Sequence, residues 1–419
     1  MPISATHIAE YKIMSSLSVL VSGAGIAGPV LAFFLARAGA SVTVIERAPC
    51  PRTGGQNVDI RGHGLTILRR MGVEEAVRAK VTHEQGLRFV DEKNASWADF
   101  PVLDGQGFTS DIEIMRGDLG NVLYEASKDM SGVKYVFGET IIALSEDAEG
   151  VTVSFENGMP SQRFDVVVAA DGWASRTRKL AFGADESRKA VNDLGQWAAW
   201  YTIPHESSDS DWARWYNAPG KRMILLRPDN KERSRVSLWI MPKDDVLDKA
   251  CKEAMTQQKA TWTRLFEDAG WESNRVLKAM EQADDFYMQK IAQIKLPAWS
   301  KGRVVLAGDA GYCPSPISGM GTTSAIVGAY CLAGEIAKSP SNLSAAFEAY
   351  GTRMSKFVSI AQKLAPGAPS MANPDSWWGI RLLHIFLGFV AWTGLQNKMG
   401  ASFHPPSQAM ELPEYVFAN

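Results

Sequence analysis

Cysteine is scarce in this chain, with four residues among 419. Small secreted proteins held by disulfides use many more, and no two of these cysteines have the short spacing of zinc ligands. The sequence therefore predicts free thiols in a cytoplasmic protein, and it predicts no metal site. The four residues are Cys50, Cys251, Cys313 and Cys331.

An excess of charge of either sign is also missing. Lys and Arg together number 44, Asp and Glu number 46, and the formal net charge is -2. A protein that binds the phosphate backbone of a nucleic acid has an extended surface of positive electrostatic potential, which this composition does not supply. We therefore expect no nucleic-acid partner and look to small molecules instead.

Long apolar runs are absent as well. The best candidate for a membrane span is Gly379 to Leu395. Arg381 and His384 interrupt it, and the uncharged remainder is too short to cross about 30 Å of hydrocarbon. We favour a helix packed on the protein's own surface and do not expect membrane attachment. Met1 to Ser16 lacks the sustained apolar core of a secretory signal.

A strand, a glycine-rich turn, a helix and a second strand follow one another near the N-terminus. A dinucleotide site needs a tight turn, backbone that can approach a pyrophosphate, and a closely packed helix, and the three glycines here have the required spacing. Glu46, at the end of the second strand, can accept hydrogen bonds from a ribose diol. The sequence therefore predicts a βαβ unit that holds an adenine dinucleotide. Its parts are Ser18 to Ser22, then Gly23, Gly25 and Gly28, the helical stretch Val30 to Arg37 and the strand Ser41 to Ile45.

The pattern along the chain predicts a discontinuous first domain. From about Val191 to Phe286, alternating aromatic runs predict an antiparallel sheet with one apolar and one exposed polar face. Phe164 to Ala170 and Arg303 to Ala307, on either side, have the pattern of buried strands. We expect an α/β fold, with a Rossmann-type domain in 16–80, 111–190 and 290–365, an inserted antiparallel-sheet substrate domain in 81–110 and 191–289, and a C-terminal helical segment in 366–419.

Further motifs make the assignment more specific. Residues 171 to 178 read Asp-Gly-Trp-Ala-Ser-Arg-Thr-Arg, and Gly308-Asp309 is followed by Pro316 and by Gly319-Met320-Gly321. With the first glycines, Glu46-Arg47 and Arg116, they resemble in order the motifs of the group A flavoprotein monooxygenases, which are built like p-hydroxybenzoate hydroxylase. The arrangement is most similar to the branch of tetracycline-inactivating monooxygenases and secondary-metabolite hydroxylases.

The resemblance implies that the first domain binds FAD. Because no residue is marked as an attachment point, we expect FAD to be held without a covalent bond. Asp309 would bind a ribityl hydroxyl, Arg116 the ribityl or phosphate part, and Arg47 would lie beside the adenosine. Asp171 would touch FAD and help the nicotinamide to bind, although a role as a plain helix cap is an alternative. For Arg47 and Arg116 the alternative is an ion pair on the protein surface. The implied cofactor contacts are Gly23, Gly25, Ala27, Gly28, Glu46, Arg47, Arg116, Asp171, Gly172, Gly308, Asp309, Pro316, Gly319, Met320 and Gly321.

The resemblance also implies the reaction. NADPH or NADH would reduce FAD, and O2 would then form a flavin hydroperoxide that hydroxylates a small aromatic or polyketide-like substrate. No second Gly-x-Gly-x-x-Gly occurs in the chain, which agrees with a nicotinamide cofactor that docks only transiently.

Aromatic side chains of the inserted domain are the candidates for a substrate chamber, which must be apolar to shield a reactive oxygen donor. Alternate residues of a strand face opposite sides, so about half must point away, and core packing is the alternative for each. Arg222 and Arg227 are candidates for a phenolate or carboxylate of the substrate, or lie at a solvated edge. No catalytic base is assigned. The candidates are Trp197, Tyr201, Trp215, Arg222, Leu225 and Trp239, with Trp200, Tyr216, Arg227 and Met241 beside them.

Other functions use the same FAD motifs. A flavin-dependent halogenase needs a Trp-x-Trp-x-Ile-Pro pattern, which Trp377-Trp378-Gly379-Ile380 does not match. A flavin-dependent oxidase, reductase or cyclase that inserts no oxygen stays open, because the motifs do not report the fate of O2. A binding protein that keeps FAD as a sensor is a third alternative.

Overall fold

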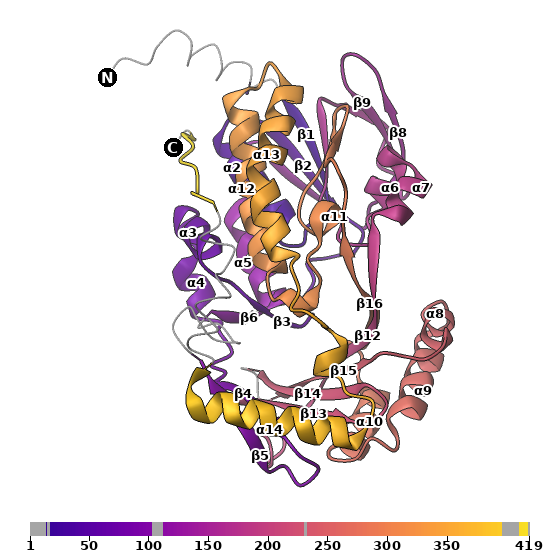
Figure 1. Ribbon diagram of the computed structural model, residues 1–419. Helices are drawn as coiled ribbons and strands as arrows, with labels where there is room; N and C mark the ends of the chain where they lie inside the picture. The colour runs from indigo at the N-terminus through magenta and orange to yellow at the C-terminus, as the bar shows by residue number, and fades with distance from the viewer. Residues whose placement is uncertain (1–13, 15–16, 103–111, 230–232, 396–409, 418–419) are drawn as a thin grey trace.

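The chain forms two lobes, each built on one large sheet (Figure 1). The computed structural model describes residue 14 and residues 17–102, 112–229, 233–395 and 410–417. The first sheet has the order β17-β18-β11-β1-β2-β7, and its strands are parallel except for the edge strand β17. The bounds are β1 Ser18–Ser22, β2 Ser41–Glu46, β7 Val133–Phe137, β11 Val166–Ala169, β17 Ser300–Lys301 and β18 Val304–Leu306.

Both faces of this sheet are covered, which is why its strands are apolar on both sides. Val19 and Val21 of β1 pack in the cluster that includes the helices, whereas Leu20 between them packs against a three-stranded antiparallel sheet on the other face. The helices of the first cluster are α2 Ala27–Arg37, α3 His63–Arg70, α4 Glu74–Arg78, α5 Arg116–Ser127, α12 Gly321–Lys338 and α13 Leu343–Ala361, and the small sheet is β8 Ile141–Glu146, β9 Val151–Phe155 and β10 Gln162–Phe164.

The second lobe is built on a seven-stranded sheet of order β16-β12-β15-β14-β13-β4-β5. Its pairs are antiparallel except for β4 with β13, which run parallel. The α/β fold with a Rossmann-type domain and a substrate lobe is confirmed, although its sheet is not purely antiparallel. The bounds are β4 Gly86–Val90, β5 Ser96–Pro101, β12 Val191–Pro204, β13 Trp212–Ala218, β14 Arg222–Asp229, β15 Arg233–Ile240 and β16 Tyr287–Ile294.

The prediction of one exposed polar face for this sheet is wrong. Tyr201 and Ile203 of β12 pack with Trp262 in a buried cluster under the helices, while Trp200 of the same strand is buried on the opposite side. Both faces are therefore covered, because β12 carries apolar residues in both registers. The helices are α8 Val246–Ala250, α9 Met255–Phe266 and α10 Ser273–Gln282.

Short elements connect the lobes. The glycine-rich stretch Gly54 to Gly64 contains a strand, β3 Asn57–Asp59, which pairs antiparallel with β6 Glu113–Met115. Two further helices follow β11, and a third begins directly after β18. These helices are α6 Arg176–Phe182, α7 Ala184–Lys189 and α11 Asp309–Tyr312, and the turns η1 Pro316–Ser318 and η2 Ser370–Ala372 complete the set.

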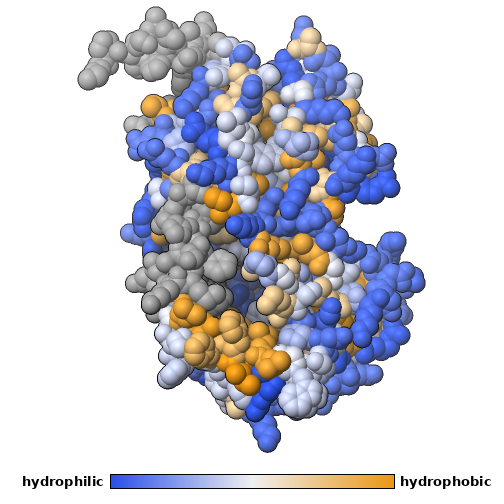
Figure 2. Space-filling view, in the orientation of Figure 1, coloured by the Kyte–Doolittle hydropathy of each residue, from blue (hydrophilic) through white to orange (hydrophobic). Residues whose placement is uncertain are grey.

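The C-terminal segment contacts both lobes. Helix α14, Trp377–Thr393, lies along β5 and packs Val390 and Leu387 on Phe89 and Phe100 (Figure 1). The outer side of α14 is an apolar stripe, visible as the large orange patch at the lower left of Figure 2. None of the described helices is both long and apolar enough to cross a membrane. The exposed side chains of the stripe are Trp378, Leu382, Ile385, Phe386, Phe389 and Trp392.

The tail after α14 returns to the first lobe. Tyr330 of α12 and Arg70 of α3 both donate hydrogen bonds to the carbonyl oxygen of Pro413, at 2.9 and 3.0 Å. Tyr415 donates to Glu335 at 2.5 Å, and its ring covers Gly334 of α12. The tail thus replaces solvent over the outer side of α12. The boundaries of the domains themselves stay a prediction.

Substituting Gly334 tests this packing. A Cβ at Gly334 would lie 2.2 Å from Cδ2 of Tyr415, so Gly334→Ala should displace the tail, lower Tm and speed cleavage of the C-terminus in limited proteolysis. Gly351→Ala on α13 is the matched control, because its Cβ meets nothing within 4 Å. That substitution should stabilise the helix by about 1 kcal/mol. Equal protection of the tail in both variants would contradict the contact.

Candidate FAD and substrate site

The turn after β1 brings glycine backbone against glycine backbone. A Cβ on Gly28 would lie 2.0 Å from the carbonyl oxygen of Gly23, and one on Gly23 would lie 2.4 Å from that of Ala170. Gly25 differs, because the only described atom near its Cβ position is Nη2 of Arg116 at 3.9 Å. Two of the glycines are therefore required by the protein's own packing, and the third faces open space where a pyrophosphate can approach.

The N-terminus of α2 is available to an anion. Its N-cap residue, Ile26, makes no side-chain hydrogen bond to the helix, and Pro29 in the first turn has no N–H to satisfy. Free N–H groups and the helix dipole at such an end favour phosphate. Ala27 packs here against Gly308, whose Cβ position is 3.4 Å from the Ala27 Cβ, so the first and last motifs of the sequence meet at this point.

Glu46 lies at the carboxyl end of β2 beside the same turn. Its carboxylate accepts hydrogen bonds from the backbone N–H groups of Ala24 and Ala48, both at 3.1 Å, and from Arg52 at 3.0 Å. Burial alone would raise the pKa of Glu46, but these hydrogen bonds and the Arg52 charge bring it below its usual range. Glu46 is thus an anionic acceptor at neutral pH, as binding a ribose diol requires. Arg47 is exposed at the same edge of the sheet.

Arg116 and Asp309 face the turn from two other elements. Arg116 begins α5, and its Cβ is 3.1 Å from the Cβ position of Gly55. Asp309 begins α11 directly after β18, and its Oδ1 is 3.9 Å from the Cβ position of Gly321. Burial raises the pKa of Asp309, and the nearby charge of Arg116 opposes that rise. The structure therefore brings these two predicted residues together.

The loop before α12 presents a second uncapped helix end. Gly319 has a φ of +63°, and the N–H of Met320 donates to Oγ of Ser318 at 3.1 Å. Met320, the N-cap of α12, provides no side-chain hydrogen bond to the helix. Thr323 in the first turn accepts a hydrogen bond from the backbone N–H of Arg61 at 3.1 Å. An 18-residue helix begun in this way favours negative charge at its end.

The Asp171-Gly172 element has partners within the protein. Asp171 accepts hydrogen bonds from the backbone N–H of Thr177 at 3.0 Å and from Oγ of Ser175 at 2.5 Å. The formal N-cap of α6 is Ser175, which accepts from the backbone N–H of Arg178 at 2.9 Å. Arg178 is buried and donates to the carbonyl oxygen of Ala310 at 2.7 Å. The motif therefore holds α6 against α11, and a direct contact of Asp171 with the cofactor stays a prediction.

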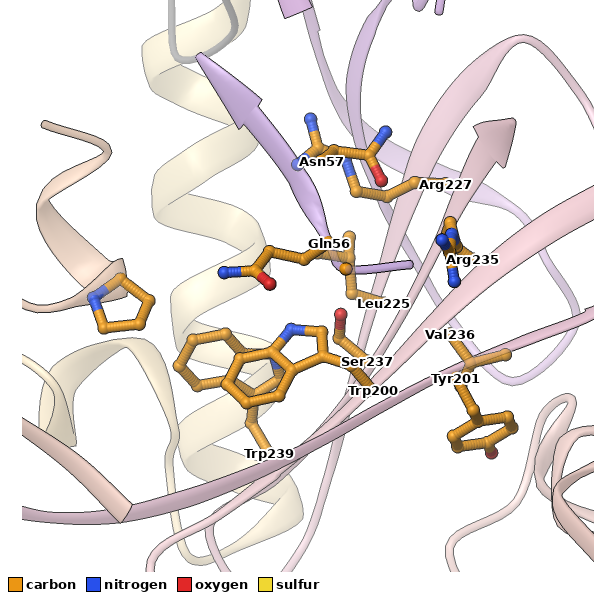
Figure 3. Close-up of a pocket in the computed structure, with 12 residues that line it drawn as sticks. Gln56, Asn57, Trp200, Tyr201, Leu225, Arg227, Arg235, Val236, Ser237 and Trp239 are labelled. Atoms are coloured by element: carbon orange, nitrogen blue, oxygen red, sulfur yellow. The ribbon is translucent and has the colours of Figure 1, made fainter. Parts of the chain in front are cut away.

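A cavity of about 100 Å³ lies between the seven-stranded sheet and the loops of the first lobe (Figure 3). Trp200 and Trp239 form an aromatic wall, with ring centroids 5.5 Å apart, and Tyr287 stacks on Trp200 at 5.0 Å. Figure 3 shows Gln56 directed towards the two indole rings, and Gln56 accepts a hydrogen bond from the Tyr287 hydroxyl. The residues around the cavity are Gly55, Gln56, Asn57, Trp200, Tyr201, Leu225, Arg227, Arg235, Val236, Ser237, Trp239 and Pro316.

The predicted substrate residues divide between the two faces of the sheet. Leu225 and Trp239 line the cavity, and Trp215 packs on the same face. Trp197 and Tyr201 project from the opposite face into the core under the helices, where the Tyr201 hydroxyl donates to the carbonyl oxygen of Val276. Only the backbone of Tyr201 borders the cavity, because its side chain points away (Figure 3).

Trp197 and Tyr201 were predicted to contact the substrate. This prediction is wrong, because strand alternation turns both side chains away from the cavity. The prediction that Arg222 contacts the substrate is also wrong. Arg222 donates to the carbonyl oxygens of Pro219 and Leu265 and pairs with Asp268, beside the end of α9.

Sequence reasoning missed the polar wall of the cavity. Gln56 and Asn57 come from the glycine-rich stretch Gly54 to Gly64, and Arg235, Ser237 and Trp239 occupy every second position of β15. The signal was available in that alternation, because residues two apart on a strand share a face. Among the described residues, no group of three or more His, Cys, Asp or Glu could hold a metal ion.

The geometry defines a dinucleotide-binding site of the flavoprotein kind. The open face at Gly25, the free helix ends and the carboxylates Glu46 and Asp309 suit the phosphates and hydroxyls of FAD. A model of the family described as FAD binding domain matches residues 16–358. The chain belongs to this family.

Relatives specify the activity. An FAD-dependent monooxygenase of Sarocladium schorii is 38% identical over 96% of this chain and 98% of its own. A flavin-dependent monooxygenase of Legionella longbeachae is 36% identical over 83% of this chain and 87% of its own. The crystal structure of the tetracycline destructase Tet(51) has a TM-score of 0.78 at 29% identity and covers 96% of this chain and 99% of its own. The present chain is an FAD-dependent monooxygenase, in the branch that the motifs indicated.

Substitution of the first glycines separates cofactor binding from folding. Gly25→Ala should leave the apoprotein as stable as the parent, because the methyl group meets no described protein atom closer than 3.9 Å. It should weaken FAD binding by at least about tenfold by obstructing the phosphates. Gly28→Ala, whose Cβ would be 2.0 Å from a backbone oxygen, should lower both Tm and FAD affinity. Flavin fluorescence titration and thermal unfolding give the two quantities, and unchanged FAD affinity in Gly25→Ala would contradict this site.

Proposed function

We propose that this monooxygenase hydroxylates a small aromatic or polyketide-like compound held in the cavity beside Trp200 and Trp239. The observation that carries the proposal is the position of this cavity. One wall is aromatic and belongs to the substrate lobe, while Pro316 and Gly55 on the other side belong to the loops that lead to α12 and contact Arg116. A ring placed there would lie next to the flavin end of the FAD site.

The residues of the first lobe divide the binding of FAD among them. Gly25 and the start of α2 would hold the pyrophosphate, with Glu46 on the ribose and Arg116 and Asp309 towards the ribityl chain. The end of α12 would face the flavin ring and favour negative charge on it. When bound, FAD supplies the redox chemistry, for which NAD(P)H provides two electrons and O2 provides the oxygen atom.

The cavity side chains would position the substrate and exclude water. Trp200 and Trp239 offer aromatic faces, and Leu225, Met223 and Ile317 complete an apolar cluster around them. Such a wall suits an aromatic ring and keeps water from a reactive oxygen donor. We also propose a cytoplasmic location, which the free thiols Cys50 and Cys251 on the surface support.

Isotope incorporation tests the proposal. The FAD-loaded protein is given NAD(P)H, 18O2 and a panel of phenols, polyketides and tetracyclines. We expect one compound to stimulate NAD(P)H oxidation and to gain one 18O atom. Stimulated oxidation that yields only hydrogen peroxide would instead indicate an oxidase.

A pair of tryptophan variants locates the reaction in the cavity. Trp200→Leu should raise the KM for the compound that responds roughly tenfold, because it loses aromatic stacking and buried area worth about 1.5 kcal/mol. Trp377→Leu, at the exposed start of α14, should leave KM unchanged. The same KM in both variants would place the substrate elsewhere.

A further inference from the structure

Three polar side chains lie in a row on the cavity side of β15. Arg235, Ser237 and Trp239 are each two residues apart, and all three border the cavity, whereas Leu238 and Ile240 pack on the opposite face. Figure 3 shows Ser237 beside the indole of Trp200. The strand therefore presents a line of hydrogen-bond donors along an otherwise aromatic wall.

Two of these donors have no acceptor among the described residues. Nε1 of Trp239 and Nε of Arg235 are both buried and without a hydrogen-bond partner, and the two side chains belong to residues only 9% and 8% exposed. A buried donor without an acceptor is costly, and native proteins nearly always satisfy it. Because Trp239 borders the cavity, an oxygen of a bound ligand is the natural acceptor for its N–H group.

The charge of Arg227 is already neutralised. Its guanidinium makes a bidentate ion pair with Glu84, at 2.9 and 3.0 Å, and it also pairs with Glu113. Both carboxylates are buried. Burial raises the pKa of Glu113 well above its usual range, and Glu84 and Asp59 raise it further against the opposing charge of Arg227. This cluster is neutral while Glu113 holds its proton and net negative when it does not.

Arg235 is balanced in the same way. Its Nη1 lies 2.5 Å from Asp285, and its Nε lies 3.8 Å from Asp229, which also pairs with Arg233. The carboxylate side chain of Asp229 is completely buried. The second arginine of the wall therefore has its countercharges within the protein.

The wall formed by β14 and β15 offers no net positive charge. Each arginine that borders the cavity faces two carboxylates, so an additional carboxylate on a ligand would be desolvated without gaining a free cation. This holds in either protonation state of Glu113. The groups are the guanidiniums of Arg227, Arg233 and Arg235 and the carboxylates of Glu84, Glu113, Asp229 and Asp285.

We propose that the cavity selects an uncharged aromatic substrate with an accepting oxygen, such as a carbonyl or hydroxyl, which binds the Trp239 N–H, and that it rejects aromatic carboxylates. The inference rests on the proposed function only in taking this cavity as the substrate site. It also reverses one expectation from the sequence, in which Arg227 was a candidate for binding a substrate carboxylate or phenolate.

Two ligands of nearly equal shape test the selectivity. 3-Hydroxybenzamide and 3-hydroxybenzoate differ in charge at pH 7, and a cavity of about 100 Å³ is close in scale to one that holds a single ring. Dissociation constants for the FAD-loaded protein come from the change in flavin absorbance and from tryptophan fluorescence. We expect the amide to bind at least about tenfold more tightly than the acid. Equal or tighter binding of the acid, or no binding of either ligand, would overturn the inference.

Variants separate the two parts of the proposal. Asp285→Asn removes a countercharge of Arg235 and should tighten binding of 3-hydroxybenzoate about tenfold while changing the amide little. Trp239→Phe removes the N–H and should weaken the amide by a similar factor without helping the acid. Glu84→Gln combined with Glu113→Gln repeats the charge test at Arg227 should Asp285→Asn fail to fold. Glu186→Gln, at an exposed position of α7, is the control and should change neither constant.

The outcomes also distinguish this inference from the proposed function. No gain in acid binding in either charge variant would overturn the role of charge, and an unchanged amide constant in Trp239→Phe would overturn the role of the N–H. Selective binding of the amide, with only hydrogen peroxide formed from 18O2 across the whole compound panel, would overturn the proposed function while upholding the selectivity.

Discussion

The backbone contact between Gly23 and Gly28 is the constraint on which the rest of the site depends. It leaves no room for a side chain, so α2 crosses β1 closely enough for its free N-terminus to stand at the carboxyl edge of the sheet. Ala27 at that end touches Gly308, and Gly308 in turn lies 3.4 Å from Ala325 of α12 at its Cβ position. Three segments far apart in the sequence are thereby fixed around one space, with Glu46, Arg116 and Asp309 on its borders.

The two lobes are joined by charge as well as by packing. Arg227 of the substrate sheet reaches Glu113 on β6, and Asn57 on β3 donates to the same carboxylate at 2.5 Å. Buried ion pairs of this kind are weak evidence for stability, because desolvation offsets most of the Coulomb attraction. Their geometric effect is clearer. They hold the glycine-rich segment of the first lobe against β14, so that residues from both lobes form one cavity.

The sequence was most informative where a motif requires a particular backbone. The glycines after β1, the acid at the end of β2 and Gly308-Asp309 after β18 each need a fixed place on a parallel sheet, and the structure brings them to one edge. Side-chain direction in the substrate sheet was harder to predict. β12 is apolar in both registers, so alternation alone could not tell that Trp200 faces the cavity while Trp197 and Tyr201 face α9 and α10. Glu84 and Glu113 could not be placed from sequence, because their partner Arg227 lies more than a hundred residues away.

The parallel pairing of β4 with β13 has a consequence for how the molecule is made. The substrate sheet draws strands from residues 86–101 and again from 191–294, while the helix that covers the first sheet, α12, ends only at Lys338. Neither hydrophobic core can be completed until most of the chain has been synthesised. The edges of the early strands therefore stay unpaired until the later strands are available. Contacts of such long sequence separation slow folding and prolong the exposure of apolar strands. Each lobe therefore depends on contacts between distant parts of the sequence, although the two look separate in space.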